Sequence, residues 1–151
     1  MRNATTYYVN FVSALLLFLF VYTTLSKLSD FNFFRATLST QPLIGDNSHW
    51  VSWAIIIPEI VISILLFIPK YRMVGLICSV SILIVFTIYI AYMLATFPHL
   101  PCSCGGVISK MSWTQHLFFN TTLILLGIAA VYLKKSNKLF IAINRSSRIP
   151  V

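Results

Sequence analysis

Charged residues are scarce in this sequence, and acidic residues are the scarcest. Only 9% of the 151 residues are charged, and three carboxylates stand against eleven lysines and arginines. A soluble domain carries roughly 25% charged residues, so most of this protein's surface does not face water. Three acids also leave little room for hydrolytic chemistry.

Several functional motifs are missing as well. The sequence has no CxxC…CxxC metal pattern, no glycine-rich phosphate-binding loop and no arguable set of catalytic serine, histidine and aspartate. It also has no long linker, low-complexity tract or convincing repeat. We therefore expect one domain over residues 1–151.

Long apolar segments take the place of charged surface. A helix that crosses a bilayer needs about 20 mostly apolar residues, with a lower limit near 17. So short a chain could not bury four such segments inside a soluble core. The sequence predicts an all-α integral membrane protein, a four-transmembrane-helix antiparallel bundle. The expected spans are residues 7–26, 51–69, 73–96 and 115–133.

The basic residues indicate how the bundle lies in the membrane. Eight of the eleven fall on the N-terminus, the second connection and the tail 134–151, which share one side of a four-span protein. The positive-inside rule places that side in the cytoplasm. The protein would then be N-in/C-in, with extracytoplasmic loops 27–50 and 97–114. We expect a multi-pass protein of a bacterial inner membrane, whose basic tail contacts anionic lipid of the bilayer and no nucleic acid.

Three connecting segments carry local structure signals. Residues 31–38, FNFFRATL, could form a short interfacial helix, and residues 69–73, PKYRM, a tight turn. Residues 112–115, SWTQ, fit a capping box at the start of the fourth span.

A polar island, HLPCSCGGVISK at residues 99–110, holds two of the three cysteines. Three interpretations of Cys102 and Cys104 stay open. The pair could be a redox disulfide, because a small strained ring is easily reduced, or a structural disulfide that staples the loop. The third interpretation is a soft-metal site for copper or zinc. Its ligands would be His99, Cys102, Cys104, Met111 and His116.

The remaining cysteine, Cys78, lies near the cytoplasmic end of the third span. At 1.5 Å per residue, roughly 25 Å separates it from the outer end of that helix, so it cannot pair with the other two. We expect it to behave as a small apolar side chain.

Glu59 is the only acid inside an expected span. An ionisable residue in a membrane is a functional-site hypothesis by default, and Pro58 before it would kink the helix. In a functional interpretation, Glu59 handles protons or binds a quinone-like head group. In a structural interpretation, it pairs with Lys27 or bonds to a neighbouring helix and fixes the bundle.

A polar stripe marks one face of the fourth span. Ser112, His116 and Asn120 recur at every fourth residue, and Gly127 continues the stripe. Such a face normally points into a helix bundle. His116 would lie near the cysteine loop, where it could accept a proton from a thiol or serve only as a hydrogen-bonded interface residue.

Three segments together resemble a known family. They are FLFVYTTLSKLSDF (18–31), IPEIVISILLFI (57–68) and PCSCGGVISKMSWTQHLFFNTTLILL (101–126). The chain resembles the DoxX-like superfamily and, within it, the MauE branch of redox-associated membrane proteins. The resemblance implies a four-helix protein that supports maturation of disulfide-rich periplasmic proteins with a thioredoxin-like partner. The family-like positions are Lys27, Glu59, Cys102, Cys104 and Asn120.

The sequence departs from established membrane disulfide oxidases, which use two cysteine pairs and a quinone. Only one pair, Cys102 and Cys104, is expected outside the membrane. Either the pair passes electrons straight to a bound quinone, or the protein is a docking subunit of a larger membrane complex. We favour a pair that exchanges with a periplasmic thioredoxin-like or substrate thiol, supported by Glu59 and His116.

Overall fold

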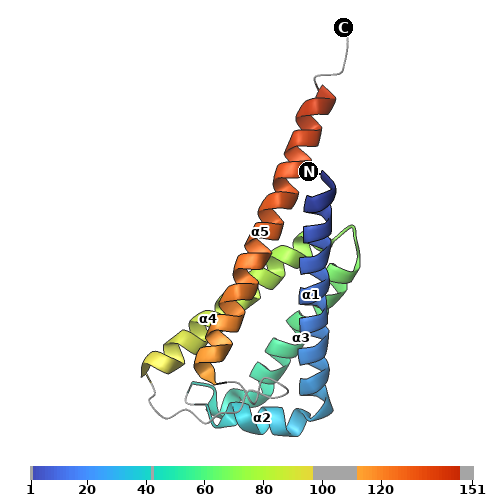
Figure 1. Cartoon of the computed structure of the whole chain (residues 1–151). Coiled ribbons are helices and arrows are strands. Elements are labelled where there is room, and N and C mark those ends of the chain that lie inside the picture. The colour runs from blue at the N-terminus through green and yellow to red at the C-terminus, as the bar shows by residue number, and fades with distance from the viewer. Residues whose placement is uncertain (1, 42, 97–111, 147–151) are drawn as a thin grey trace.

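The computed structural model describes residues 2–41, 43–96 and 112–146, and within these ranges the regular structure is entirely helical. Four helices are long and apolar enough to cross a membrane, which confirms the predicted fold class. Figure 1 shows them packed as a bundle. The elements are α1 (Arg2–Ser29), α2 (Phe31–Ser39), η1 (Gly45–Asn47), α3 (Ser48–Phe67), α4 (Arg72–Thr96) and α5 (Trp113–Ser146).

The outer faces of the four long helices carry many large apolar side chains. Between 22% and 33% of each spanning window is buried inside the bundle. Large hydrophobic side chains such as Phe11, Phe18 and Tyr132 point outward and are well exposed. A helix that is apolar all round needs an apolar surrounding, so a lipid bilayer is the environment that this surface fits.

The chain runs up and down through the bundle. A tight turn at residues 68–71 joins α3 to α4, as the sequence predicts, and Tyr71 N–H donates to the Ile68 carbonyl at 3.0 Å. The N-terminus and the C-terminal part of α5 lie at the same end of the bundle (Figure 1). The side of the membrane on which this end lies remains the prediction made from the basic residues.

One half of the bundle is packed closely, and we call it the packed half. Its core comprises buried residues of α1, α3, α4 and α5, among them Val12, Leu16, Leu66 and Leu76. A Cβ atom added at Gly75 would lie 2.8 Å from the backbone nitrogen of Leu66. The absence of a side chain at this position therefore lets α4 approach α3 directly.

The opposite half of the bundle, which we call the cavity half, is crossed by the short helix α2 (Figure 1). Helix α2 confirms the short helix predicted at 31–38, and Asp30 caps it by accepting from the Phe33 N–H at 3.1 Å. The capping box at the start of α5 also forms. Ser112 N–H donates to Gln115 Oε1 at 2.9 Å, and Gln115 N–H donates to Ser112 Oγ at 3.3 Å.

Candidate functional site

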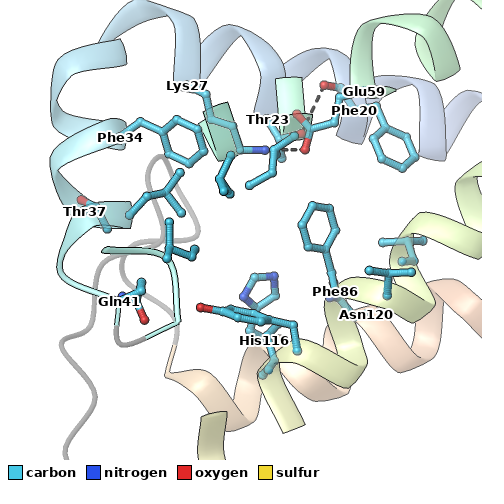
Figure 2. Close-up of a pocket in the computed structure, with 18 of the residues that line it drawn as sticks. Phe20, Thr23, Lys27, Phe34, Thr37, Gln41, Glu59, Phe86, His116 and Asn120 are labelled. Carbon is cyan, nitrogen blue, oxygen red and sulfur yellow. Dashed lines mark hydrogen bonds and ion pairs between the residues drawn. The ribbon is translucent and has the colours of Figure 1, made fainter. Parts of the chain in front are cut away.

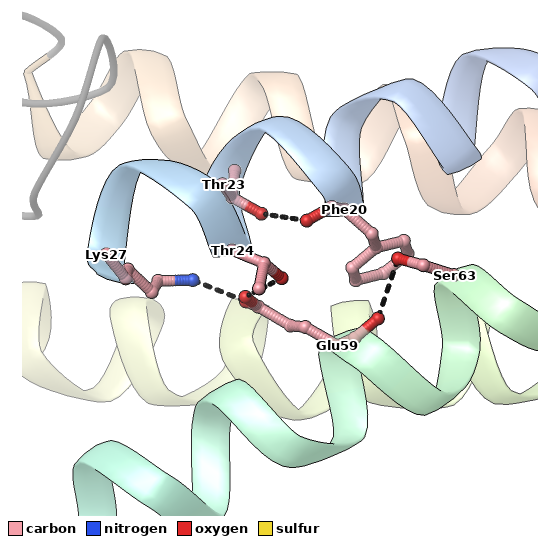
Figure 3. Close-up of polar contacts among 6 residues, drawn as sticks. All are labelled: Phe20, Thr23, Thr24, Lys27, Glu59 and Ser63. Atoms are coloured by element: carbon pink, nitrogen blue, oxygen red, sulfur yellow. Dashed lines mark hydrogen bonds and ion pairs between the residues drawn. The ribbon is translucent and has the colours of Figure 1, made fainter. Parts of the chain in front are cut away.

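An ion pair joins α1 to α3 inside the bundle. Lys27 Nζ donates to Glu59 Oε1, and the side chains of Lys27 and Glu59 are only 14% and 3% exposed. Thr24, one helical turn before Lys27, donates its hydroxyl to the other carboxylate oxygen at 3.1 Å. Figure 3 shows both partners reaching Glu59 from α1. The pairing that the structural interpretation of Glu59 predicted is therefore present.

Local geometry fixes both ends of this pair. Helix α3 continues through Pro58, and Ser63 donates to the Glu59 carbonyl oxygen at 2.8 Å. The Lys27 ammonium also lies 5.8 Å from the centre of the Phe34 ring on α2, within range of a cation–π contact. Because the charges neutralise each other, the pair links three elements without a net charge inside the membrane.

A cavity of about 400 Å³ opens beside this pair. Its wall takes side chains from α1, α2, α3, α4 and α5, so it lies where the helices diverge. Figure 2 shows the Lys27–Glu59 pair on one side of the cavity and His116 on the other. The wall is mainly aliphatic and aromatic. Its polar members are Thr23, Lys27, Thr37, Gln41, Glu59, Tyr89, His116 and Asn120.

Of the predicted polar stripe, His116 and Asn120 face the bundle, whereas Ser112 is exposed and caps the start of α5. His116 is partly buried and Asn120 is 4% exposed, and both line the cavity. Further along the stripe, a Cβ atom at Gly127 would lie 2.6 Å from Val80 Cγ2, so α5 lies close to α4 there. The structure therefore brings Lys27, Glu59, His116 and Asn120 around one space, although they come from three helices.

Gln41 is a polar residue that sequence reasoning missed. It follows α2 and is only 4% exposed, and its side-chain oxygen accepts no hydrogen bond from the described residues. Thr24 was missed as well, although it contacts the Glu59 carboxylate. The spacing of Thr24 and Lys27 was a usable signal for one face of α1, whereas a lone glutamine in a polar connection carries no periodicity.

The cysteine and metal predictions fall largely outside this description. Cys102, Cys104, His99 and Met111 lie outside the described residues, and His116 alone of the predicted ligand set lies within them. Among the described residues, no three His, Cys, Asp or Glu side chains are grouped so that they could hold a metal ion.

Cys78, the third cysteine, is free and partly buried on α4. It packs against the hydrophobic core as the sequence predicts. A small apolar role is the one that its surroundings fit.

Comparison with known proteins gives one family match. A family model described as methylamine utilisation protein MauE matches residues 5–133. That range covers nearly all of the four spanning segments, and it contains the ion pair, the cavity wall and the Cys102–Cys104 segment. No curated protein and no solved structure matches the chain.

Proposed function

The chain belongs to the MauE family of methylamine utilisation proteins, and from that membership we propose that it supports thiol–disulfide exchange at the outer face of a bacterial inner membrane. The family links this multi-pass membrane protein to methylamine utilisation. The finer proposal is that Cys102 and Cys104 exchange with a thioredoxin-like partner or a disulfide-rich periplasmic substrate.

The observation that carries this proposal is that the helices on either side of the cysteine segment both line the cavity. Residues 97–111, which hold both cysteines, join the end of α4 to the start of α5. Both of those helices contribute to the cavity wall, through Tyr89 and Ile90 in the last third of α4 and His116 in the first turn of α5. The segment that holds the two thiols is therefore flanked in sequence by two helices that line the cavity, and a histidine follows Cys104 by twelve residues.

The exchange has a simple balance of electrons. A substrate thiolate attacks the Cys102–Cys104 disulfide, so one S–S bond breaks and a mixed disulfide forms. A second substrate thiolate then attacks the mixed disulfide, which leaves the substrate oxidised and the pair reduced. The reduced pair holds two electrons and two protons, which an acceptor of the quinone class would remove. In this proposal His116 receives a proton as a thiol becomes a thiolate.

A second candidate function is a non-catalytic subunit of a larger membrane complex. The observation that favours it is that each of the two carboxylate oxygens of Glu59 already accepts a hydrogen bond. A carboxylate held in this way stabilises the bundle and has little freedom to transfer protons. In that case the Cys102–Cys104 disulfide would only hold its loop.

Trapping of mixed disulfides tests the proposal. Cys78→Ala leaves Cys102 and Cys104 as the only thiols of the 151-residue chain. In that background, Cys104→Ser or Cys102→Ser should accumulate a mixed disulfide with a partner, detected by non-reducing electrophoresis and mass spectrometry. The Cys102→Ser/Cys104→Ser double variant is the matched control. If neither single variant traps a partner and the double variant still supports methylamine growth, the subunit function replaces the exchange function.

The redox potential of the pair gives a second, independent readout. Structural disulfides tend to lie below about −300 mV, whereas exchange-active ones lie well above that value. We expect a potential near or above about −200 mV, measured by thiol alkylation in graded dithiol buffers. Two thiols that never form a disulfide, together with copper or zinc lost in the double variant, would instead support the metal site.

A further inference from the structure

We propose that the cavity between α1, α2, α3, α4 and α5 binds a neutral amphiphile, namely a hydroxylated aromatic ring that carries an apolar tail. The inference goes beyond the proposed thiol chemistry and does not depend on it, because every residue that supports it lies in the described helices and connections.

Gln41 supplies the main argument. Its side-chain oxygen is buried and accepts no hydrogen bond from any described residue, although a buried acceptor without a donor costs about 1–3 kcal/mol. Its backbone is fixed, since the carbonyl oxygen accepts from Ile44 N–H at 3.1 Å and Gly45 N–H at 3.2 Å. The φ of +45° at Gly45, which favours glycine, allows this turn. Gln41 is thus held at the cavity wall, and a ligand in the cavity could supply the hydrogen-bond donor that its side-chain oxygen lacks.

The charges around the cavity indicate a neutral ligand. Lys27 and Glu59 lie on the wall opposite Gln41 (Figure 2), and each already neutralises the other. An anion or a cation would have to compete with that pair inside a medium of low dielectric constant. A hydroxyl group can donate to Gln41 without adding charge.

The apolar part of the wall indicates what carries the hydroxyl group. Phe20, Phe34, Phe86 and Phe119 line the cavity together with aliphatic side chains. Aromatic side chains pack favourably against another ring in offset or edge-to-face geometry. Because the wall has little polar surface beyond its few named polar residues, the rest of the ligand must be apolar.

The volume agrees with a ring and a tail. An apolar cavity of about 150 Å³ is enough to hold benzene, and the cavity here measures about 400 Å³. A single ring would leave more than half of this space unfilled. A reduced quinone belongs to the class of ligand described, as does any long-chain phenol.

A pair of probes that differ only in the donor tests the inference. Tritiated 4-nonylphenol is bound to the purified full chain in detergent and displaced by unlabelled 4-nonylphenol or by its methyl ether, 4-nonylanisole. We expect saturable binding of one phenol per chain, and about fivefold to tenfold weaker binding of the ether, because the ether cannot donate to Gln41. Neither probe undergoes thiol exchange, so the result is separate from that of the trapping experiment.

Gln41→Leu should remove the difference between the two probes. The phenol should bind this variant about as weakly as the ether does, while Thr121→Leu, at an exposed position of α5 outside the cavity wall, should keep the wild-type ratio. Gln41→Leu should not lower the melting temperature of the empty protein, because it removes a buried acceptor without a partner.

Two results would overturn the inference. One is the absence of saturable phenol binding to the wild-type chain. The other is equal affinity of the phenol and its ether for that chain, which would mean that water satisfies Gln41. A clear loss of stability in Gln41→Leu would show that the glutamine serves the fold, and would also count against a ligand-binding role.

Discussion

The two halves of the bundle differ in the charge of their buried polar groups. In the packed half, Ser13 and Ser79 each donate to a carbonyl oxygen of their own helix at 2.7 Å. In the cavity half, Thr24 and Lys27 donate across the bundle to Glu59. Bonds between helices also occur in the packed half, where the Tyr8 hydroxyl donates to the Leu126 carbonyl oxygen at 3.3 Å. What distinguishes the cavity half is that its link between helices is a buried ion pair.

Side-chain size explains why the halves differ in packing. Gly75 and Gly127 allow close helix contacts in the packed half, and small residues at helix interfaces permit such approach in membranes. In the cavity half, phenylalanines and a fifth element, α2, contribute to the cavity wall. The same four spans therefore pack closely at one end and leave a cavity at the other.

We expect the largest effect from breaking the Lys27–Glu59 ion pair, which links α1 to α3 beside the cavity. Glu59→Ala leaves the Lys27 ammonium without its counter-charge at a position where that side chain is only 14% exposed. Removing one member of a buried ion pair typically costs about 3–5 kcal/mol. We expect a loss of that size in the free energy of unfolding, measured by denaturant titration of the purified protein in micelles.

A double substitution and a surface acid provide controls for this result. Lys27→Met combined with Glu59→Met should recover most of the loss, because it removes both charges and keeps apolar bulk. Asp46→Ala changes an exposed acid in η1 and should alter stability by less than about 0.5 kcal/mol. If Glu59→Ala were as mild as Asp46→Ala, the pair would have no part in holding the cavity half.

A second prediction compares the space available in the two halves. Gly75→Ala and Val51→Ile each add one carbon, the first against the Leu66 backbone nitrogen and the second at the cavity wall. Gly75→Ala should destabilise the protein by about 1–3 kcal/mol, even though alanine favours a helix by about 1 kcal/mol. Val51→Ile should change stability by less than about 0.5 kcal/mol. The same unfolding titration measures both, and equal effects would contradict the contrast in packing.

The spans could be predicted because lipid contact requires long apolar segments. The ends of the helices could not, because a helix is a property of the backbone and continues through polar residues that lie outside the bilayer. Helix α1 begins at Arg2 and not near residue 7, and α5 continues to Ser146, beyond the expected boundary at 133. The apolar segment locates the membrane contact, while caps and neighbouring elements decide where each helix ends.

The candidate site could be predicted only in part. A single acid within a span needs a partner, so the Lys27–Glu59 pair was one of two structural options offered by the sequence. The cavity and Gln41 could not be predicted, because the space arises where five helices meet and a buried glutamine in a connection follows no period. Cys102 and Cys104 are conspicuous in the sequence, and the trapping experiment and the redox potential test their role.

We expect the smallest effect on stability from removing a side-chain cap at the start of a helix beside the cavity. Helices α2 and α5 both start there with a side-chain cap. Ser112→Ala removes the hydroxyl that accepts from Gln115 N–H, at a typical cost of about 1 kcal/mol. We expect roughly fivefold faster amide hydrogen exchange at Gln115 and no change at Leu76 in the packed half. Thr121→Val, which removes an exposed hydroxyl that bonds within α5, should leave exchange at Gln115 unchanged. If Ser112→Ala also left it unchanged, tertiary packing would hold this helix end, and the cavity half would be more rigid than its open interior indicates.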